Sequence, residues 1–383
     1  MNIAFFSLYV LGTQGAIAAE TYIREASKQD KIDRVFVFDA PKNKRKIEGF
    51  DSVFLKLRND KKNFNRILNA IRVFKLIKRN QIKVLHFFYR LNNIPTISLA
   101  KILCILFNVK CTFICDHRSV NLSPTPNRRK ALNLLLFPID IYAGNINAVK
   151  TNHFFHYSNK KKEAKIFDLG WNDFLFNKIN KKLPFYYQKS LPLYGDRNIK
   201  SEDRIVIWYV GTLSKANRDP LFIPKTLEIL SQILGDSDYI FKIAGPCSKE
   251  VRNYLKKIKK VKILGKISQR SLYERMYSDR HKNSIGLAYM ALRHQMAPSL
   301  KMVEYALTGF KIVASDTIGM RQQAERFGVE VGAFTRNTPE LFADSIIKLI
   351  NQKKVPNWGR SEDYAYSRLF KDQVLPVYLE NDK

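Results

Sequence analysis

The chain has 383 residues, of which 45% are hydrophobic, and its formal net charge is +32. This length predicts two domains rather than one, and this hydrophobic content is that of a globular protein with buried cores. No run of about 18 uninterrupted apolar residues occurs, so no membrane-spanning helix is expected. The four cysteines show neither a disulfide framework nor zinc spacing, which favours a reducing, cytoplasmic setting.

The positive charge is concentrated in residues 1–200, where lysines and arginines far outnumber acidic residues. Such a field attracts anionic partners, namely nucleic acid, acidic lipid surfaces or phosphorylated substrates. Lysines on ordinary solvated faces would produce the same excess, so charge alone does not choose among these interpretations.

Strand and helix patterns alternate from the N-terminus. The opening apolar segment lacks a basic n-region and a clear small-residue cleavage site, so we interpret it as a buried strand rather than a signal peptide. It is followed by a glycine-bearing turn and a helix to about Lys28. Further strands are predicted at 34–40, 83–88, 110–117, 148–153 and 164–170, and helices at 64–80, 94–107 and 128–142.

The pattern lapses near residue 180 and resumes at residue 204. Apolar strands are then predicted at 204–211, 239–245, 260–265, 283–290 and 310–315, with helices between them and at 338–352 and 361–381. Near-continuous apolar strands between helices indicate parallel sheets covered on both faces. The predicted fold class is therefore α/β, with two Rossmann-like domains and a ligand in the cleft between them. The expected parts are residues 1–180, a linker at 181–203, residues 204–360, and a C-terminal helix at 361–383 that packs back towards the first domain.

Two familiar nucleotide motifs are absent from the sequence. The first turn carries Gly12 and Gly15 without the complete G-x-G-x-x-G order, and only Asp39 is placed to contact a ribose. No P-loop motif occurs. Asp236 and Asp238 are interpreted as part of a capping turn rather than as a metal site. Dinucleotide and P-loop chemistry are therefore disfavoured, and no metal is expected.

Several motifs follow one another in the second half: "YVGTLSKANRD", "FKIAGP", "LGKISQRSLYERM", "SIGLAYM" and "SLKMVEYALTGFKIVASD". In this order they resemble the nucleotide-sugar-binding domain of GT-B glycosyltransferases, most closely glycosyltransferase family 4, over about residues 204–350. In the first half, "FFSLYVLGTQGA" and "IFDLGWNDFLF" are similar to that family's first glycine-bearing turn and last strand. The resemblance implies a metal-independent transferase with a UDP- or GDP-linked sugar donor and no other cofactor.

The resemblance gives ligand roles to one predicted helix. Ser299 is placed as its N-cap, where free backbone N–H groups and the helix dipole suit a diphosphate. Lys301 in the first turn would add a positive charge to the same phosphates. Glu304 lies on the same side of the helix, and in the family a glutamate here accepts hydrogen bonds from the ribose hydroxyls. The alternative is an ordinary ion pair between Lys301 and Glu304 on a solvated face.

Other donor and acceptor contacts are expected in two loops. Gly211 would allow a ligand to approach the backbone closely, and the family places a basic residue after this glycine, near the diphosphate. Arg218 is the first choice for that residue and Lys215 the second. Gly12 and Gly15 are expected on the acceptor side. An ordinary strand-to-helix loop with solvated cations remains the alternative for the Gly211 loop.

The sequence departs from the family at Met296, where the resemblance leads one to expect a second glutamate facing the donor sugar. The stereochemical outcome, retaining or inverting, therefore stays open. An inverting enzyme needs a general base, and Asp116 at the end of a predicted strand is the candidate, with His117 as a sugar or phosphate contact. The alternative is a capping aspartate beside a satisfied histidine.

The basic first domain is expected to bind the acceptor, a saccharide or a lipid-linked saccharide of cell-surface polysaccharide, lipopolysaccharide or capsule synthesis. A predicted helix at 63–80 has a basic face that could contact an anionic membrane, as could Arg128, Arg129 and Lys130. We therefore expect a cytoplasmic protein, peripheral on the inner face of the membrane, that does not bind nucleic acid. The alternatives are a sugar-nucleotide epimerase of the same fold and a basic nucleic-acid-binding protein.

Overall fold

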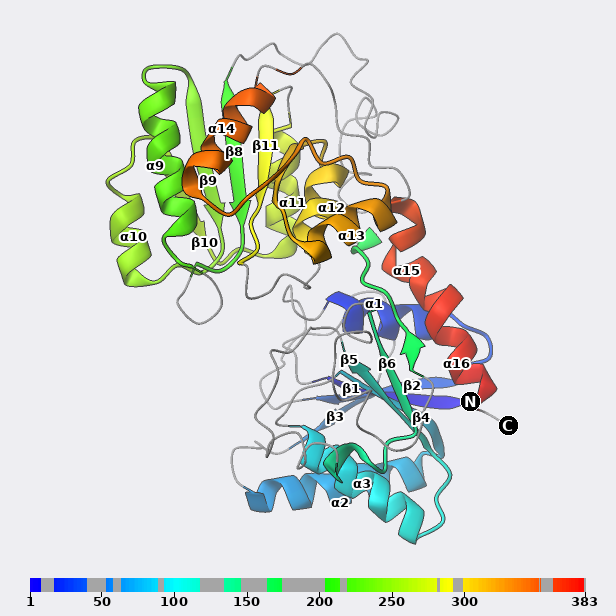
Figure 1. The fold of residues 1–383 in the computed structure, drawn as a ribbon. Coiled ribbons are helices and arrows are strands. Elements are labelled where there is room, and N and C mark those ends of the chain that lie inside the picture. The colour runs from blue at the N-terminus through cyan, green and yellow to red at the C-terminus, as the bar shows by residue number, and fades with distance from the viewer. Residues whose placement is uncertain are drawn as a thin grey trace. The chain divides into compact units, whose positions relative to one another are not determined.

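The computed structural model consists of two units, each with a parallel sheet and flanking helices (Figure 1). The first unit contains Met1–Asn172 and Tyr364–Lys383, and the second contains Asp173–Asp363. The structure describes residues 1–7, 17–39, 53–57, 63–88, 93–117, 134–145, 164–173, 204–213, 219–280, 283–291, 299–350, 352 and 361–381.

The first unit is built on a parallel sheet whose described strands follow the order β3-β2-β1-β4-β5-β6-β7. The chain reverses its direction of travel across the sheet between β1 and β4, which are neighbours. In sheets of this kind, ligands bind beside the carboxyl ends of the strands at such a reversal. The strands are β1 (Asn2–Ser7), β2 (Arg34–Asp39), β3 (Val53–Lys56), β4 (Ile82–Phe88), β5 (Thr112–His117), β6 (Ile141–Gly144) and β7 (Lys165–Ile166).

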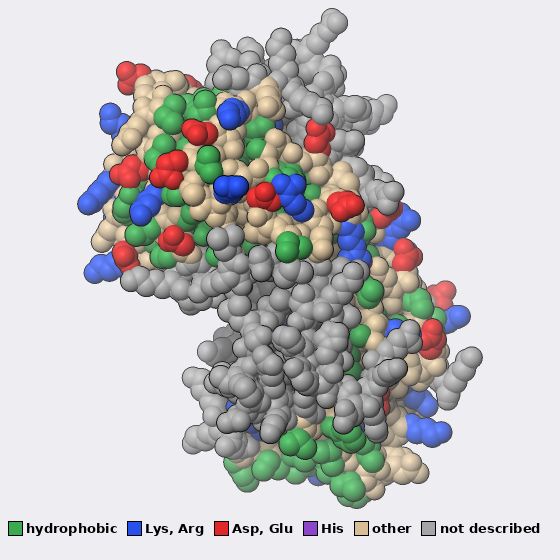
Figure 2. All heavy atoms as spheres, in the orientation of Figure 1, with side chains coloured by type: hydrophobic (Ala, Val, Ile, Leu, Met, Phe, Trp, Pro, Cys, Tyr) green, Lys and Arg blue, Asp and Glu red, His purple; other side chains and the backbone are tan. Residues whose placement is uncertain are grey.

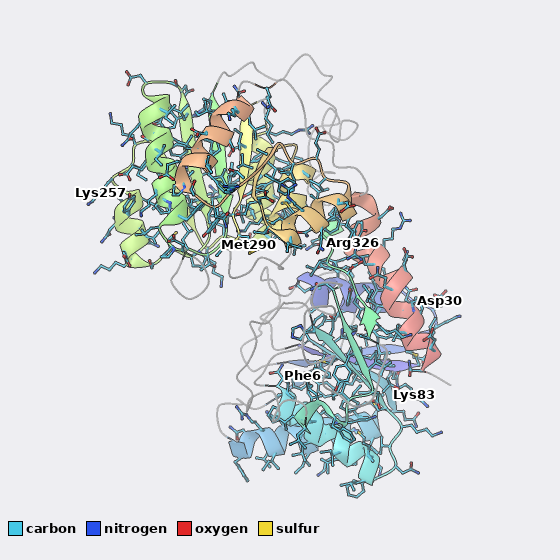
Figure 3. The ribbon with its side chains drawn as sticks, in the orientation of Figure 1. Phe6, Asp30, Lys83, Lys257, Met290 and Arg326 are labelled. Atoms are coloured by element: carbon cyan, nitrogen blue, oxygen red, sulfur yellow. The ribbon has the colours of Figure 1, made fainter. Side chains whose placement is uncertain are left out.

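Helices cover both faces of this sheet. On one face α1 (Ile17–Ala26) packs with the C-terminal segment around Tyr22, Val37 and Phe370. On the other, α2 (Asn63–Arg79) and α3 (Ile94–Leu106) pack against the alternate residues of the same strands. Phe6 belongs to this second layer, whereas Asp30 and Lys257 lie at the surface of their units (Figure 3).

The C-terminal segment is not the single helix that its pattern predicts. It contains a 3₁₀ turn (Ser361–Tyr364), α15 (Tyr366–Leu369), a π-helical turn (Phe370–Val374) and α16 (Leu375–Glu380). Pro376 lies in the first turn of α16 and has no N–H to donate to the preceding turn, which accounts for the break in the α-helical pattern. Tyr366, Phe370 and Tyr378 are buried in the core of the first unit.

The second unit has a parallel sheet with the order β10-β9-β8-β11-β12-β13. The reversal here lies between β8 and β11, which pair directly. The strands are β8 (Ile205–Val210), β9 (Tyr239–Ala244), β10 (Val261–Gly265), β11 (Ser284–Ala288), β12 (Lys311–Ser315) and β13 (Ala333–Thr335). The helices are α9 (Phe222–Leu234), α10 (Lys249–Leu255), α11 (Gln269–Ser278), α12 (Leu300–Leu307), α13 (Ile318–Phe327) and α14 (Pro339–Ile350).

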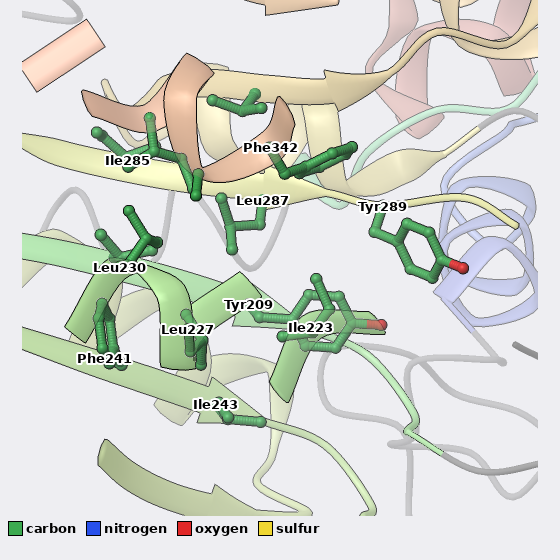
Figure 4. Packing of buried hydrophobic residues seen from close by; sticks show 14 of the residues in the cluster. Tyr209, Ile223, Leu227, Leu230, Phe241, Ile243, Ile285, Leu287, Tyr289 and Phe342 are labelled. Atoms are coloured by element: carbon green, nitrogen blue, oxygen red, sulfur yellow. The ribbon is translucent and has the colours of Figure 1, made fainter. Parts of the chain in front are cut away.

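Alternate residues of β11 face opposite layers of the second unit. Ile285 and Leu287 point into the apolar core that β8, β9, α9 and α14 share (Figure 4). Gly286 points the other way, against the ring of Tyr305 in α12. Strand alternation therefore places α12 on the face of the sheet opposite α9 and α14.

The predicted α/β fold with two Rossmann-like units is confirmed, but the helix predicted at 128–142 is wrong over its last part, and two strands were missed. Residues 128–142 were expected to be helical, yet Ile141–Gly144 form β6, and Pro138 lies just before it where a helix interior would be disrupted. The edge strands β3 and β13 were not predicted. Within the described ranges, no helix has the length and apolar character needed to cross a membrane.

Candidate functional site

The second unit brings several candidate residues together at the carboxyl end of its sheet. Gly211 follows directly after β8, on one side of the reversal, and α12 follows β11 on the other side. α12 begins at Leu300, after Ser299 in extended conformation. This is the position at which parallel α/β sheets bind ligands.

Lys301 reaches from α12 to the end of β8. Its Nζ lies 4.6 Å from the centroid of the Tyr209 ring. A Cβ built on Gly211 would lie only 2.7 Å from the same nitrogen, and Gly211 has a φ of 148°. Glycine at this position therefore gives the amine its place, because a side chain here would be strained and would displace it.

The strand ends around Gly211 are packed backbone to backbone. A Cβ on Gly245, which follows β9 with φ 136°, would lie 2.1 Å from the carbonyl oxygen of Gly211. The Gly211 N–H donates to the Ala244 carbonyl at 2.8 Å, and the Gly245 N–H donates to the Gly265 carbonyl at 2.7 Å. These contacts hold Gly211 against the ends of β9 and β10.

Tyr305 fixes α12 on the sheet. Its hydroxyl accepts a hydrogen bond from the Val210 N–H at 3.0 Å and lies 3.3 Å from the Trp208 carbonyl oxygen. Its ring fills the space above Gly286, where a Cβ would lie 2.3 Å from the ring. Tyr305 is fully buried, so the helix that carries Lys301 and Glu304 is anchored against both β8 and β11.

Lys301 and Glu304 are buried side chains, 8% and 3% exposed. The face that carries them is therefore not the solvated face that the ion-pair alternative requires. The Tyr273 hydroxyl from α11 donates to Glu304 Oε1 at 3.2 Å, and Gln269 Nε2 donates to that hydroxyl at 2.9 Å. Burial, together with the negative charge of Glu304, raises the pKa of Tyr273 well above its usual range, so Tyr273 remains a donor.

Ser299 occupies the N-cap position of α12 without making a side-chain capping hydrogen bond to the helix. Its backbone N–H instead donates to the Oε1 of Gln323 in α13, and both residues are buried. Gln323 therefore fixes the start of α12, while the first-turn N–H groups receive no cap from the Ser299 hydroxyl.

In the first unit, Asp116 and His117 end β5. Asp116 is fully buried, and its Oδ2 lies 3.3 Å from Nε2 of His86, whose Nδ1 lies 2.6 Å from the hydroxyl of Tyr378 in α16. His117 is 3% exposed, and burial lowers its pKa to about 4, so its imidazole is neutral near pH 7. This chain of contacts ties β5 and β4 to the C-terminal segment.

The structure thus places Lys301 beside Gly211 and holds Ser299, Lys301 and Glu304 on or next to one helix. The remaining sequence candidates lie outside the described residues, namely Gly12, Gly15, Lys215, Arg218 and Met296. Tyr209, Tyr273 and Gln323 were not predicted as site residues. Their aromatic or amide character gave no signal, because each meets the site only through the tertiary fold. Among the described residues, no group of three or more His, Cys, Asp or Glu side chains could hold a metal ion.

No protein-family model matches the sequence, and no curated protein matches it. Solved structures are similar over the full chain. A glycosyltransferase from Rickettsia africae has a TM-score of 0.64 at 15% identity, covering 100% of this chain and 98% of that one. Anabaena Alr3699/HepE, in complex with UDP-glucose, has a TM-score of 0.61 at 14% identity, with the same coverage. The UDP-GlcNAc 2-epimerase of Methanocaldococcus jannaschii has a TM-score of 0.57 at 13% identity, covering 98% of this chain and 100% of that one. The chain therefore has the GT-B fold, with two Rossmann-like α/β units.

Proposed function

We propose that the protein is a glycosyltransferase that takes a sugar from a nucleoside-diphosphate sugar. The observation that carries the proposal is the buried Lys301 amine, which lies against Gly211 and the Tyr209 ring at the start of α12. Glu304 is held one turn further along the same helix. A cation, a helix N-terminus and an oriented carboxylate in this order match a diphosphate followed by a ribose.

In this proposal the diphosphate binds at the N-terminus of α12. Backbone N–H groups and the helix dipole favour its negative charge there, and Lys301 adds a charge-assisted hydrogen bond. The Tyr209 ring stabilises the buried amine through a cation–π contact, worth about 2 kcal/mol for a desolvated pair.

Glu304 then binds the ribose. Tyr273 holds one carboxylate oxygen through a hydrogen bond at 3.2 Å, which orients the group before ligand binds. A carboxylate only accepts hydrogen bonds, so it suits the two adjacent ribose hydroxyls. Orientation in advance lowers the entropy cost of binding.

The transfer breaks the bond between the anomeric carbon and the diphosphate oxygen, and a bond from that carbon to the acceptor oxygen replaces it. The leaving diphosphate gains negative charge, which Lys301 and the dipole of α12 stabilise. For this reason the proposal includes independence from a metal ion. A UDP-linked donor is supported by the similar HepE structure, which contains UDP-glucose.

If the transfer inverts the anomeric centre, a general base must take the proton of the acceptor hydroxyl, and the proposal gives this role to Asp116. His117, neutral near pH 7, both donates and accepts hydrogen bonds and is proposed as a sugar contact. Asp116 also contacts His86, so a structural role must be separated from a catalytic one by experiment. The proposed acceptor is a saccharide or lipid-linked saccharide, and the proposed location is the cytoplasmic face of a membrane.

A second candidate is a sugar-nucleotide epimerase, because a UDP-GlcNAc 2-epimerase is among the similar structures. The two activities differ in what they need. An epimerase interconverts the sugar nucleotide without an acceptor, whereas a transferase releases the nucleoside diphosphate only when a hydroxyl accepts the sugar.

The proposal is tested by a thermal-shift panel of UDP-, GDP-, ADP- and CMP-linked sugars. Stabilisation by one nucleotide class, followed by acceptor-dependent release of the nucleoside diphosphate, is the expected result. Sugar interconversion without an acceptor would replace the transferase by the epimerase, and stabilisation by none of these donors would contradict both.

A further inference from the structure

The first unit has many large apolar side chains that are exposed and lie outside its buried core. Leu106 is 71% exposed, Phe107 60% and Leu134 77%. Most of the exposed large hydrophobic residues in the described part of the chain belong to this set, which we call the apolar face: Phe64, Ile67, Ile71, Ile102, Ile105, Leu106, Phe107, Leu134 and Phe137.

The elements that carry the apolar face pack against one another. α2 contacts α3, and the ring of Phe74 in α2 lies 5.3 Å from that of Phe107 at the end of α3. The Ser98 hydroxyl of α3 donates to the Leu135 carbonyl, which joins residues 134–137 to the same surface. Figure 2 shows hydrophobic side chains gathered over α2 and α3, at the lower end of the view.

Packing on the sheet does not account for these residues. In α2 the core row, including Ala70, Val73 and Ile77, is fully buried. Phe64 and Ile67 form a separate row that is 68% and 48% exposed. Soluble surfaces rarely expose large apolar side chains in a contiguous group unless the group meets a partner or a membrane.

The α3 part of the apolar face carries no exposed charge. Lys101 is the one charged residue of residues 94–107, and it is buried. Its amine lies 2.8 Å from the Cys111 carbonyl oxygen and 2.6 Å from Asp140 Oδ2. This surface therefore presents hydrocarbon without a charge that would have to be desolvated.

Cations border the apolar face. Exposed basic side chains lie along the C-terminal half of α2. The sequence has no Asp or Glu between Asp60 and Asp116. A second copy of the chain would bring these cations against each other, whereas an anionic surface would neutralise them. The bordering exposed cations are Arg72, Lys75, Lys78, Arg79 and Lys110.

We propose that the apolar face docks onto an anionic lipid surface, with its aliphatic and aromatic side chains inserted among the acyl chains and the bordering cations on the headgroups. Two modest signals acting together, hydrocarbon burial and charge, suffice for stable but reversible binding. The inference concerns the first unit alone and holds whether or not the donor proposal does.

The test is co-sedimentation of the full-length protein with vesicles of phosphatidylglycerol and phosphatidylcholine, compared with vesicles of phosphatidylcholine alone. The wild-type protein is expected to bind the anionic vesicles and to lose much of that binding at high salt. The double variant Leu106→Glu/Phe107→Glu should have an affinity for the anionic vesicles at least about tenfold lower than that of the wild type. The reason is that two exposed side chains no longer enter hydrocarbon. Both positions are exposed, so the fold should survive, and an unchanged thermal midpoint checks this.

The matched control is Ile233→Glu, at an exposed isoleucine of α9 in the second unit. It should bind vesicles like the wild type. Equal loss in Ile233→Glu and the double variant, or no binding by the wild type at low salt, would overturn the proposal. So would a wild-type dimer that the double variant dissociates without any change in vesicle binding, because the face would then join two copies of the chain. Nucleotide binding, measured on the same samples, reports separately on the donor site.

Discussion

The ammonium nitrogen of Lys301 lies 4.6 Å from the centroid of the Tyr209 ring, so a residue of α12 is held at the end of β8. Lys301 is 8% exposed, and its place depends on the absence of a side chain at Gly211. The start of α12, Gly211 and the buried Lys301 amine therefore lie together in one place. The proposed donor chemistry depends on this relationship.

Gly211→Ala should weaken nucleotide binding. The added Cβ would lie 2.7 Å from Lys301 Nζ, and an alanine at φ 148° is strained by about 1–3 kcal/mol. Gly235→Ala is the control, since Gly235 also has a positive φ, 51°, but its Cβ would meet nothing within 4 Å. Both variants should lose stability in denaturant titrations, and only Gly211→Ala should lose nucleotide affinity. Equal affinities in the two variants would remove Gly211 from the site.

Tyr273→Phe should weaken nucleotide binding several-fold while leaving the packing of α11 intact. The variant keeps the ring and removes the hydroxyl that donates to Glu304, a hydrogen bond worth about 1.5–3 kcal/mol when one partner is charged. A donor deoxygenated at the ribose should be bound equally well by variant and wild type, because it gains less from an oriented Glu304. The control Tyr254→Phe removes a tyrosine hydroxyl from an exposed contact with Glu228 in the same unit. A loss of affinity in both variants would point to a general effect of the substitution.

The free energy of unfolding should decrease as the pH is lowered from 6.5 to about 4, because of His117. Burial holds the folded pKa of His117 at about 4, below its ordinary value of 6.5. In this window the unfolded state binds a proton that the folded state does not, so acid favours unfolding, by on the order of 3 kcal/mol in total. Above pH 6.5 neither state is protonated and the contribution is flat. Denaturant titrations of His117→Gln across this window should show a shallower fall, and an identical pH profile would contradict the assignment.

Asp116→Asn separates the two roles of this carboxylate. If Asp116 is the general base, kcat should fall by about 100-fold or more, while KM for the donor changes little. The contact with His86 predicts in addition a lower thermal midpoint. His86→Leu, which removes the same contact but no proposed base, is the control for this structural effect. A kcat loss of the same size in both variants would show that Asp116 only supports the fold.

Much of the fold could be predicted because its strands are apolar and its helices have clear limits. β8 appears as a continuous apolar run and β9 and β11 as nearly continuous ones, and α12 lies between Ser299 and Gly309 as its pattern indicates. β3 and β13 were missed because they have four and three residues, too few for a periodic signal.

Contacts between residues far apart in the chain could not be predicted from the sequence. Tyr273 and Glu304 are 31 residues apart, and periodicity indicates only that each faces a core. The hydrogen bond from the Ser299 N–H to Gln323 is equally non-local. In α2, Phe64 and Ile67 lie outside the row that the sheet covers, and the spacing of apolar residues along one helix does not reveal this.

Isothermal titration of the nucleoside diphosphate, beginning with UDP, tests the central claim most directly. Lys301→Met and Glu304→Gln should each weaken binding by about tenfold to 100-fold, because each loses a hydrogen bond to a charged group. The control is Lys311→Met, at another buried lysine of the second unit, whose amine donates to the Leu349 carbonyl at 2.7 Å. This control should lose stability but keep its affinity. Wild-type affinity in both Lys301→Met and Glu304→Gln would contradict the account.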